Sequence, residues 1–81
     1  AVGLDPPLPL SVVLRVNRAQ ALLNLGRYCE ARSEARAAVK LDPTHVKGRY
    51  RLALAEAALG RHGVALSLLQ SLVEELEGEQ K

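Results

Sequence analysis

Apolar residues recur along this chain with the spacing of one face of a helix, and glycine or proline interrupts them at regular intervals. The first apolar stripe includes Leu14, Ala21 and Leu22 and stops at Gly26, which suits a helix end that needs a positive φ. A later stripe stops before Pro43, because proline cannot continue a helix. The pattern predicts a first helix ending at Gly26 and three more over about 28–41, 44–59 and 62–76.

The pattern is an internal repeat. When the chain is shifted by 34 residues against itself, 11 of the 35 pairs from Pro9/Pro43 onward are identical, and 25–27 (Leu-Gly-Arg) matches 59–61. This period is typical of a helix-turn-helix unit that buries its apolar face only by stacking on a neighbour. We therefore divide the chain into 1–8, a linker or the end of a preceding repeat, two repeats over 9–43 and 44–77, and a tail over 78–81.

Composition supports an all-α fold. Hydrophobic residues make up 48% of the chain, but Tyr28 and Tyr50 are its two aromatic residues, and it has no Trp, Phe or Met. Leu, Ala and Val must therefore build the core, and small aliphatic side chains suit closely packed helices. No run alternates β-branched or aromatic residues with polar ones, as a strand would. Because the chain begins with Ala1, we expect it to be part of a longer protein.

Charge is unevenly distributed and points to acidic partners. Residues 1–61 contain ten basic and five acidic residues, whereas 62–81 contain one basic and four acidic residues. A basic body attracts acidic partners. Nucleic acid is disfavoured as a partner, because no aromatic residues are interleaved with the Arg and Lys for base stacking. A membrane is also disfavoured, since no apolar run approaches the ~20 residues that a spanning helix needs.

No constellation of residues indicates catalysis, a cofactor or a metal site, so we expect a protein that is not an enzyme. His45 and His62 are 17 positions apart and near loops, which is typical of surface histidines. The lone Cys29 has no partner for a disulfide or a metal, and it favours a reducing compartment, the cytoplasm, with the nucleus left open.

Two further expectations concern the charged side chains of the helix surfaces. We expect Arg32 and Arg36 to form a solvated outer face, paired with Glu30 and Glu34. The acidic run 74–79 opposes the dipole at the end of the last helix, which we expect to fray there.

The two repeats resemble the tetratricopeptide repeat family. The residues that carry the resemblance are Ala19, 25–26 (Leu-Gly), Tyr28, Ala31, Ala38 and 41–43 (Leu-Asp-Pro) in the first repeat, and Ala53, 59–60 (Leu-Gly), Ala65 and Leu69 in the second. The resemblance implies antiparallel helical hairpins stacked as a short right-handed superhelix, with the first helix of each repeat lining a concave groove. Arg15 and Arg49 replace the large aromatic residue of the family, so we expect looser packing at both positions.

Three polar residues of the first helices are the candidate binding site. Lys47 and Arg51 are four residues apart and share a helix face. Asn17 precedes Arg51 by 34 residues, which places it at the equivalent position of the other repeat. One amide donor and two cations suit a carboxylate ligand, although solvated cations and an Asn used for packing are the plainer interpretation of each residue alone.

This triple resembles the carboxylate clamp of co-chaperone tetratricopeptide domains, which bind the C-terminal Glu-Glu-Val-Asp tail of heat-shock chaperones. The resemblance implies that Asn17 and Lys47 contact the terminal carboxylates and that Arg51 contacts nearby peptide oxygens or acidic side chains. A complete clamp also needs a Lys and an Asn on a preceding repeat, for which residues 1–8 are too short. Side-chain pockets would be lined by Val13, Val16, Gln20 and Leu54.

Three functions stay open at this point. The first is an adaptor that binds the acidic C-terminal peptide of a chaperone, and the second is a scaffold that binds an internal segment of another protein. The third, a nucleic-acid module, is the least favoured. The fourth helix carries an apolar stripe that nothing in the sequence covers, so we also expect further repeats or self-association there; its members are Leu66, Leu69, Val73 and Leu76.

Overall fold

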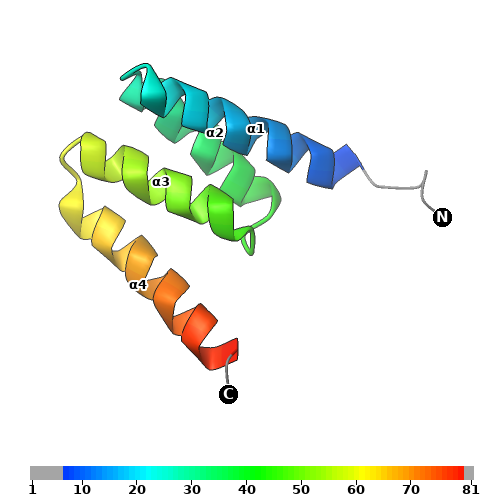
Figure 1. Cartoon of the computed structure of the whole chain (residues 1–81), viewed down its shortest axis with the longest axis vertical. Coiled ribbons are helices and arrows are strands. Elements are labelled where there is room, and N and C mark those ends of the chain that lie inside the picture. Colours follow the sequence, from blue (N-terminus) through cyan, green and yellow to red (C-terminus); the bar gives the residue numbers. More distant parts are fainter. Residues whose placement is uncertain (1–6, 80–81) are drawn as a thin grey trace.

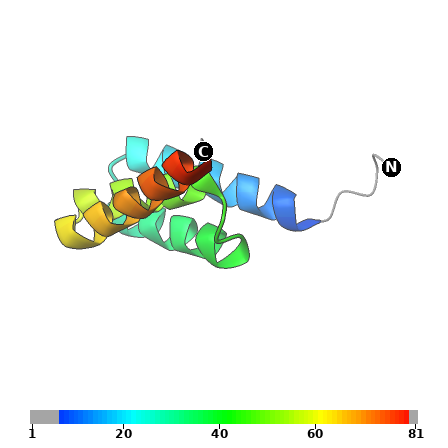
Figure 2. The same cartoon turned by 90° about the horizontal axis from the view of Figure 1, so that it is seen from below.

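The chain folds into four helices in this computed structural model, which describes residues 7–79. They are α1 (Pro7–Asn24), α2 (Tyr28–Leu41), α3 (Val46–Ala58) and α4 (His62–Glu79). Successive helices run antiparallel as two hairpins, and α1 and α3 form one layer with α2 behind them (Figures 1 and 2). Residues 7–79 contain no strand, so the predicted all-α fold of helical hairpins is confirmed.

The ends of the outer helices differ from the predicted ones. Helix α1 begins at Pro7, so 7–8 are helical rather than a linker, while 1–6 lie outside the described residues. Helix α4 continues to Glu79, past the predicted end at Leu76 and through the acidic run 74–79. Glu is a good helix former, which favours this continuation, and fraying of the helix end stays a prediction. Residues 80–81 of the predicted tail lie outside the described part.

Glycine makes the tight turn inside each hairpin, as predicted. Gly26 and Gly60 have φ angles of 79° and 87°. After α1, the N–H of Arg27 donates to the carbonyl of Leu22 at 2.9 Å and that of Gly26 to Leu23 at 3.1 Å. The corresponding pair of bonds follows α3. This arrangement satisfies the last carbonyls of the helix and requires a left-handed residue at the glycine position.

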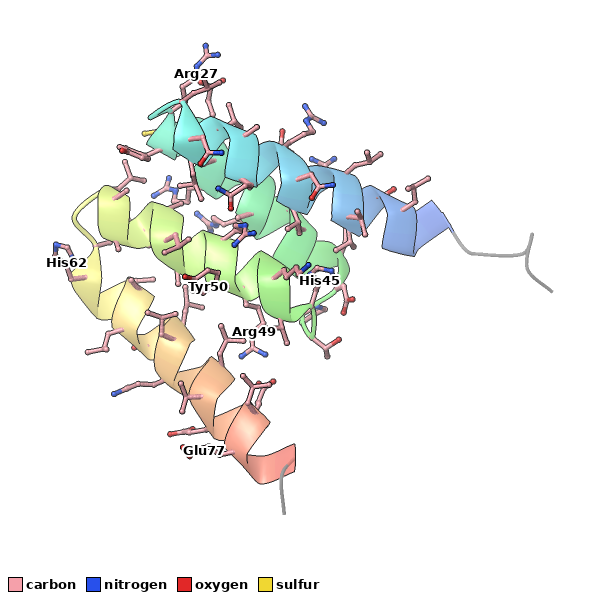
Figure 3. The ribbon with its side chains drawn as sticks, in the orientation of Figure 1. Arg27, His45, Arg49, Tyr50, His62 and Glu77 are labelled. Carbon is pink, nitrogen blue, oxygen red and sulfur yellow. The ribbon has the colours of Figure 1, made fainter. Side chains whose placement is uncertain are left out.

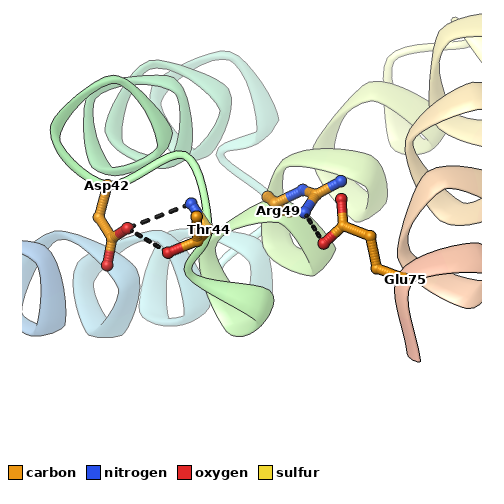
Figure 4. A network of polar contacts seen from close by, with 4 residues as sticks. All are labelled: Asp42, Thr44, Arg49 and Glu75. Atoms are coloured by element: carbon orange, nitrogen blue, oxygen red, sulfur yellow. Dashed lines mark hydrogen bonds and ion pairs between the residues drawn. The ribbon is translucent and has the colours of Figure 1, made fainter. Parts of the chain in front are cut away.

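The turn between the hairpins is held by side chains. The Asp42 carboxylate accepts hydrogen bonds from the Thr44 hydroxyl at 2.7 Å and the Thr44 N–H at 3.1 Å (Figure 4). These bonds, the hydroxyl bond first, lower the pKa of the Asp42 carboxyl. His45 then caps α3, because its Nδ1 accepts a hydrogen bond from the Gly48 N–H at 3.0 Å. His45 is therefore a structural cap and is half-buried, rather than a surface histidine.

The core consists mostly of alanine. Among the residues with described side chains, 10–77, the largest that is fully buried is Val12. One cluster joins Val12 and Val16 of α1 to Ala38 of α2. A second joins one residue from each of three helices, with Val39 and Leu68 packed against it; its members are Ala19, Ala35 and Leu52. Small side chains thus let the helices of both hairpins approach closely.

Arg15 and Arg49, which replace the large aromatic residue of the family, each bridge the two helices of their hairpin. Arg15 Nη1 lies 3.1 Å from Glu34 Oε1, which ties α1 to α2. Arg49 points from α3 toward α4 and lies 2.7 Å from Glu75 Oε1 (Figures 3 and 4). Only 11% of the Arg49 side chain is exposed, so this position is well packed, contrary to the looser packing that we expected. The Arg15 side chain is half-exposed.

The predicted pairing within α2 is wrong. Arg32 lies 3.9 Å from Glu56 Oε1 on α3, while Glu34 pairs with α1 and Glu30 with the turn residue Arg27 at 2.9 Å. The physical reason is that helix residues two positions apart do not face each other. Glu30, Arg32 and Glu34 therefore form their ion pairs with residues of neighbouring helices or turns.

A matched pair of glycine substitutions tests the turn. We expect Gly60→Ala to lower the free energy of unfolding by about 1 kcal/mol, because an L residue is strained at φ 87° although a Cβ would meet open space. We expect Gly63→Ala, in the first turn of α4 and also with open space, to raise it by about 0.5 kcal/mol. Urea denaturation of both variants measures the difference, and equal effects would contradict the interpretation.

Candidate functional site

The candidate site lies on the layer formed by the first helix of each hairpin. Helices α1 and α3 run side by side and contact each other directly (Figures 1 and 2). Asn17 belongs to α1, and Lys47 and Arg51 belong to α3. The cap at His45 starts α3 at Val46, so Lys47 falls in its first turn and Arg51 one turn later on the same face.

The three candidate residues differ in exposure. Asn17 and Lys47 are exposed, whereas Arg51 is half-buried. The Arg51 Nε is shielded from solvent and has no hydrogen-bond partner. Its guanidinium carbon lies 5.6 Å from the ring centroid of Tyr50, within the range of a cation–π contact. That all three converge on one carboxylate stays a prediction.

Carboxylates neutralise most arginines of the described part, but not the candidate cations. Ten Lys and Arg side chains lie within 10–77, and six of them are within 4.0 Å of a carboxylate, namely Arg15, Arg18, Arg27, Arg32, Arg49 and Arg61. Lys47 and Arg51 are among the other four, which have no such partner within these residues. The α1–α3 layer thus has positive charge available for an anionic ligand.

The residues predicted to line side-chain pockets separate into two groups. Val13 is exposed and Leu54 is half-buried, and Gln20 is half-buried with its Nε2 donating to Asn24 Oδ1 at 2.9 Å. Val16, in contrast, is 3% exposed, so a ligand would meet almost none of its surface, and its predicted place in the groove is corrected.

The reason for the burial of Val16 is the glycine on the facing helix. A Cβ at Gly48 would lie 3.4 Å from Val16 Cγ2 and 3.8 Å from Ala38 Cβ. Because Gly48 has no side chain, α3 comes close enough to cover Val16. Sequence reasoning also missed Tyr50, which is 42% exposed beside Arg51. The sequence feature that could have indicated Tyr50 is that it is one of two aromatic residues in the chain.

No metal site is assembled in the described part of the chain. Residues 7–79 contain no group of three or more His, Cys, Asp and Glu side chains that could hold a metal ion. Cys29 is exposed with a free thiol, and His62 is exposed at the start of α4. None of α1–α4 has the length and apolar character that crossing a membrane requires.

Comparison with known proteins identifies the repeat. Residues 16–79 match the family model described as tetratricopeptide repeat. The chain is 32% identical over 72 residues to small glutamine-rich tetratricopeptide repeat-containing protein 2 of Saccharomyces cerevisiae. The match covers 89% of this chain and 20% of that protein, so the chain spans about a fifth of the length of its curated relative. No solved structure matches significantly.

The ion pair between α3 and α4 predicts a pH dependence of stability. The hydrogen bond from Arg49 lowers the pKa of the Glu75 carboxyl. A carboxyl whose native pKa is lowered contributes stability above its unfolded pKa and loses it as the pH falls through the native pKa. We therefore expect Glu75→Gln to lower the free energy of unfolding at neutral pH but to have no effect below the native pKa of Glu75.

Denaturation across this pH range, together with an NMR titration of the carboxyl, measures the effect. Glu74→Gln is the matched control, since Glu74 makes no ion pair within 10–77 and the substitution removes the same charge. A pH-independent loss in Glu75→Gln, or the same profile for both variants, would rule out the ion pair as the cause.

Proposed function

The chain belongs to the tetratricopeptide repeat family, a family of non-catalytic protein interaction modules, and from this premise we propose that it binds the acidic C-terminal end of a partner protein on its α1–α3 layer. The observation that carries the proposal is the pair of uncompensated cations on α3. Lys47 and Arg51 lack a carboxylate partner within 10–77, in which six arginines have one.

The state of Arg51 favours an anionic ligand. A polar group that is removed from water without a hydrogen-bond partner costs free energy, and the Nε of Arg51 is such a group. A carboxylate near the guanidinium would balance its charge, and charge-assisted bonds to a guanidinium are among the stronger hydrogen bonds of proteins. Tyr50, whose ring lies against the guanidinium, would restrict its orientation.

The binding mechanism is capture of a peptide without chemistry. The Lys47 ammonium and the Asn17 amide would donate to the terminal carboxylate, while the Arg51 fork would hold a side-chain carboxylate or backbone oxygen nearby. The exposed Val13 and half-buried Leu54 would contact apolar side chains of the peptide. A chain end is preferred over an internal segment, because it offers two carboxylates close together when the last residue is acidic.

The partner that fits best is the acidic C-terminal tail of a heat-shock chaperone, which would make the chain part of a co-chaperone or adaptor. This assignment rests on the likeness of Asn17, Lys47 and Arg51 to the carboxylate clamp. We place the protein in the cytoplasm, because an exposed free thiol at Cys29 suits a reducing compartment.

A second function is favoured by the uncovered face of α4. Leu66, Val73 and Leu76 of this helix are 57%, 51% and 45% exposed, and Leu66, Leu69 and Val73 line a shallow groove there. Its equivalent on α2 faces α3, since Ala35, which matches Leu69 in the repeat, is fully buried and Arg32, which matches Leu66, lies 3.9 Å from Glu56 of α3. A scaffold that stacks on another protein, or on itself, would cover this face of α4.

Titration with an acidic tail peptide tests the proposed clamp. We expect a peptide ending in Glu-Glu-Val-Asp to bind, and Lys47→Ala/Arg51→Ala to weaken binding at least about tenfold, because charge-assisted bonds are lost. Amidation of the peptide's C-terminus should weaken binding to a similar extent. Calorimetry or fluorescence anisotropy measures the affinity.

The control for this titration is Ser67→Glu/Ser71→Glu, which lowers the net charge by the same amount at exposed positions of α4 and should leave affinity within about twofold. Equal affinity of the wild type and Lys47→Ala/Arg51→Ala for the peptide would contradict the proposed clamp. Binding that ignores both this variant and the amidation would favour recognition of an internal segment.

Light scattering tests the alternative function, self-association through the exposed face of α4. If the α4 face mediates self-association, the apparent mass should rise with concentration, and Leu66→Lys/Val73→Lys should return the protein to a monomer, because charged side chains resist burial. A wild type that stays monomeric at all concentrations would eliminate self-association through this face.

A further inference from the structure

Two further cations lie on a different helix from the candidate clamp. Arg36 and Lys40 of α2 are exposed, and within 10–77 neither has a carboxylate within 4.0 Å. They are four residues apart, so they lie one turn apart on the same face of α2. Helix α2 forms the layer behind α1 and α3 (Figures 1 and 2).

These two cations border an open groove with a partly apolar lining. The groove has a volume of about 550 Å³ and is lined by Ser33, Arg36, Ala37, Val39 and Lys40 of α2 and by Leu52 of α3. None of the candidate clamp residues lines it. Its volume is within the range of ligand sites, but the groove is open, which suits a chain segment rather than an enclosed small molecule.

The apolar part of the lining is held in place by the core. Leu52 belongs to the buried cluster with Ala19 and Ala35, and Val39 and Leu68 pack against this cluster. The aliphatic surface of the groove is thus a fixed edge of the core that reaches solvent beside two cations. An isolated pair of surface cations lacks such a surface, whereas cations beside an aliphatic lining combine two features of binding sites.

We propose that this groove is a second docking surface, which binds an acidic amphipathic helix of a partner protein. Charge complementarity indicates the partner: two carboxylates one helical turn apart would match Arg36 and Lys40, and an aliphatic residue on the same face would contact Val39 beside the narrow exposed edge of Leu52, which is 8% exposed. Nucleic acid fits less well, because no aromatic residue lines the groove for base stacking. The groove and the α1–α3 layer could then be occupied together.

NMR titration with designed peptides tests the proposal. The probe is an alanine-based helical peptide with Glu at positions i and i+4 and Leu at i+3, and the reference peptide has Gln in place of both Glu residues. We expect saturable binding of the Glu peptide, with amide shifts concentrated at Ser33, Ala37, Val39 and Leu52. The Gln peptide should bind at least about tenfold more weakly, since both charge pairs are lost.

Charge-reversal variants locate the interaction. Arg36→Glu/Lys40→Glu should reduce the affinity for the Glu peptide at least about tenfold, and the milder Arg36→Gln/Lys40→Gln, which disturbs folding less, should reduce it in the same direction. The matched control Ser67→Glu/Ser71→Glu, at two exposed positions of α4 four residues apart, lowers the net charge as much as Arg36→Gln/Lys40→Gln does and should leave affinity within about twofold. Circular dichroism confirms that each variant is folded.

Four outcomes would overturn the proposal. They are equal binding of the Glu and Gln peptides, no binding at millimolar concentration, amide shifts confined to α1 and α3, and equal losses in the α2 and α4 variants, which would indicate a general attraction between net charges. Because the acidic tail peptide tests Lys47 and Arg51 separately, failure here leaves the proposed clamp unaffected.

Discussion

Close approach of helix backbones through alanine is the constraint on which this structure depends. Ala19, Ala31, Ala35, Ala38 and Ala55 are fully buried where helices meet. Each methyl group buries little apolar area, so no single contact contributes much, and stability must come from stacking one hairpin on the next. The same closeness places α3 directly beside α1, and thereby creates the surface on which the candidate residues lie.

Since the core side chains are short, long charged side chains make many of the remaining contacts between helices. Arg15 and Arg49 reach from the first helix of each hairpin to a glutamate of the second. Other arginines neutralise Glu30, Glu34 and Glu56. The cations left over within 10–77 lie on two helices, Lys47 and Arg51 on α3 and Arg36 and Lys40 on α2. This division of charge is the basis of the two sites that we propose for anionic partners.

Sequence alone predicted the helices and turns well, because their causes are local. A glycine with positive φ and a proline that stops a helix act within a few residues, so the end at Leu41 could be predicted, and the ends at Asn24 and Ala58 to within two residues. Contacts between helices could not be predicted from the sequence in this way. The burial of Val16 depends on the missing side chain at Gly48, and Arg32 finds Glu56, which is 24 positions away. The candidate site was likewise chosen by repeat spacing, which fixes the helix face but not the convergence of three side chains.

The buried carboxylate of Glu56 bears on how the two hairpins are placed relative to each other. It is 5% exposed and lies 3.9 Å from both Arg32 of α2 and Arg61 of the turn after α3. Alanine surfaces offer few large side chains to interlock, so apolar contact alone distinguishes poorly between sliding arrangements of two such helices. A shift of α3 by one turn along α2 would take Glu56 away from Arg32, while Arg61 would move with it, and a buried carboxylate that loses a cation is destabilised. The Arg32–Glu56 pair thus favours the observed alignment of the two hairpins.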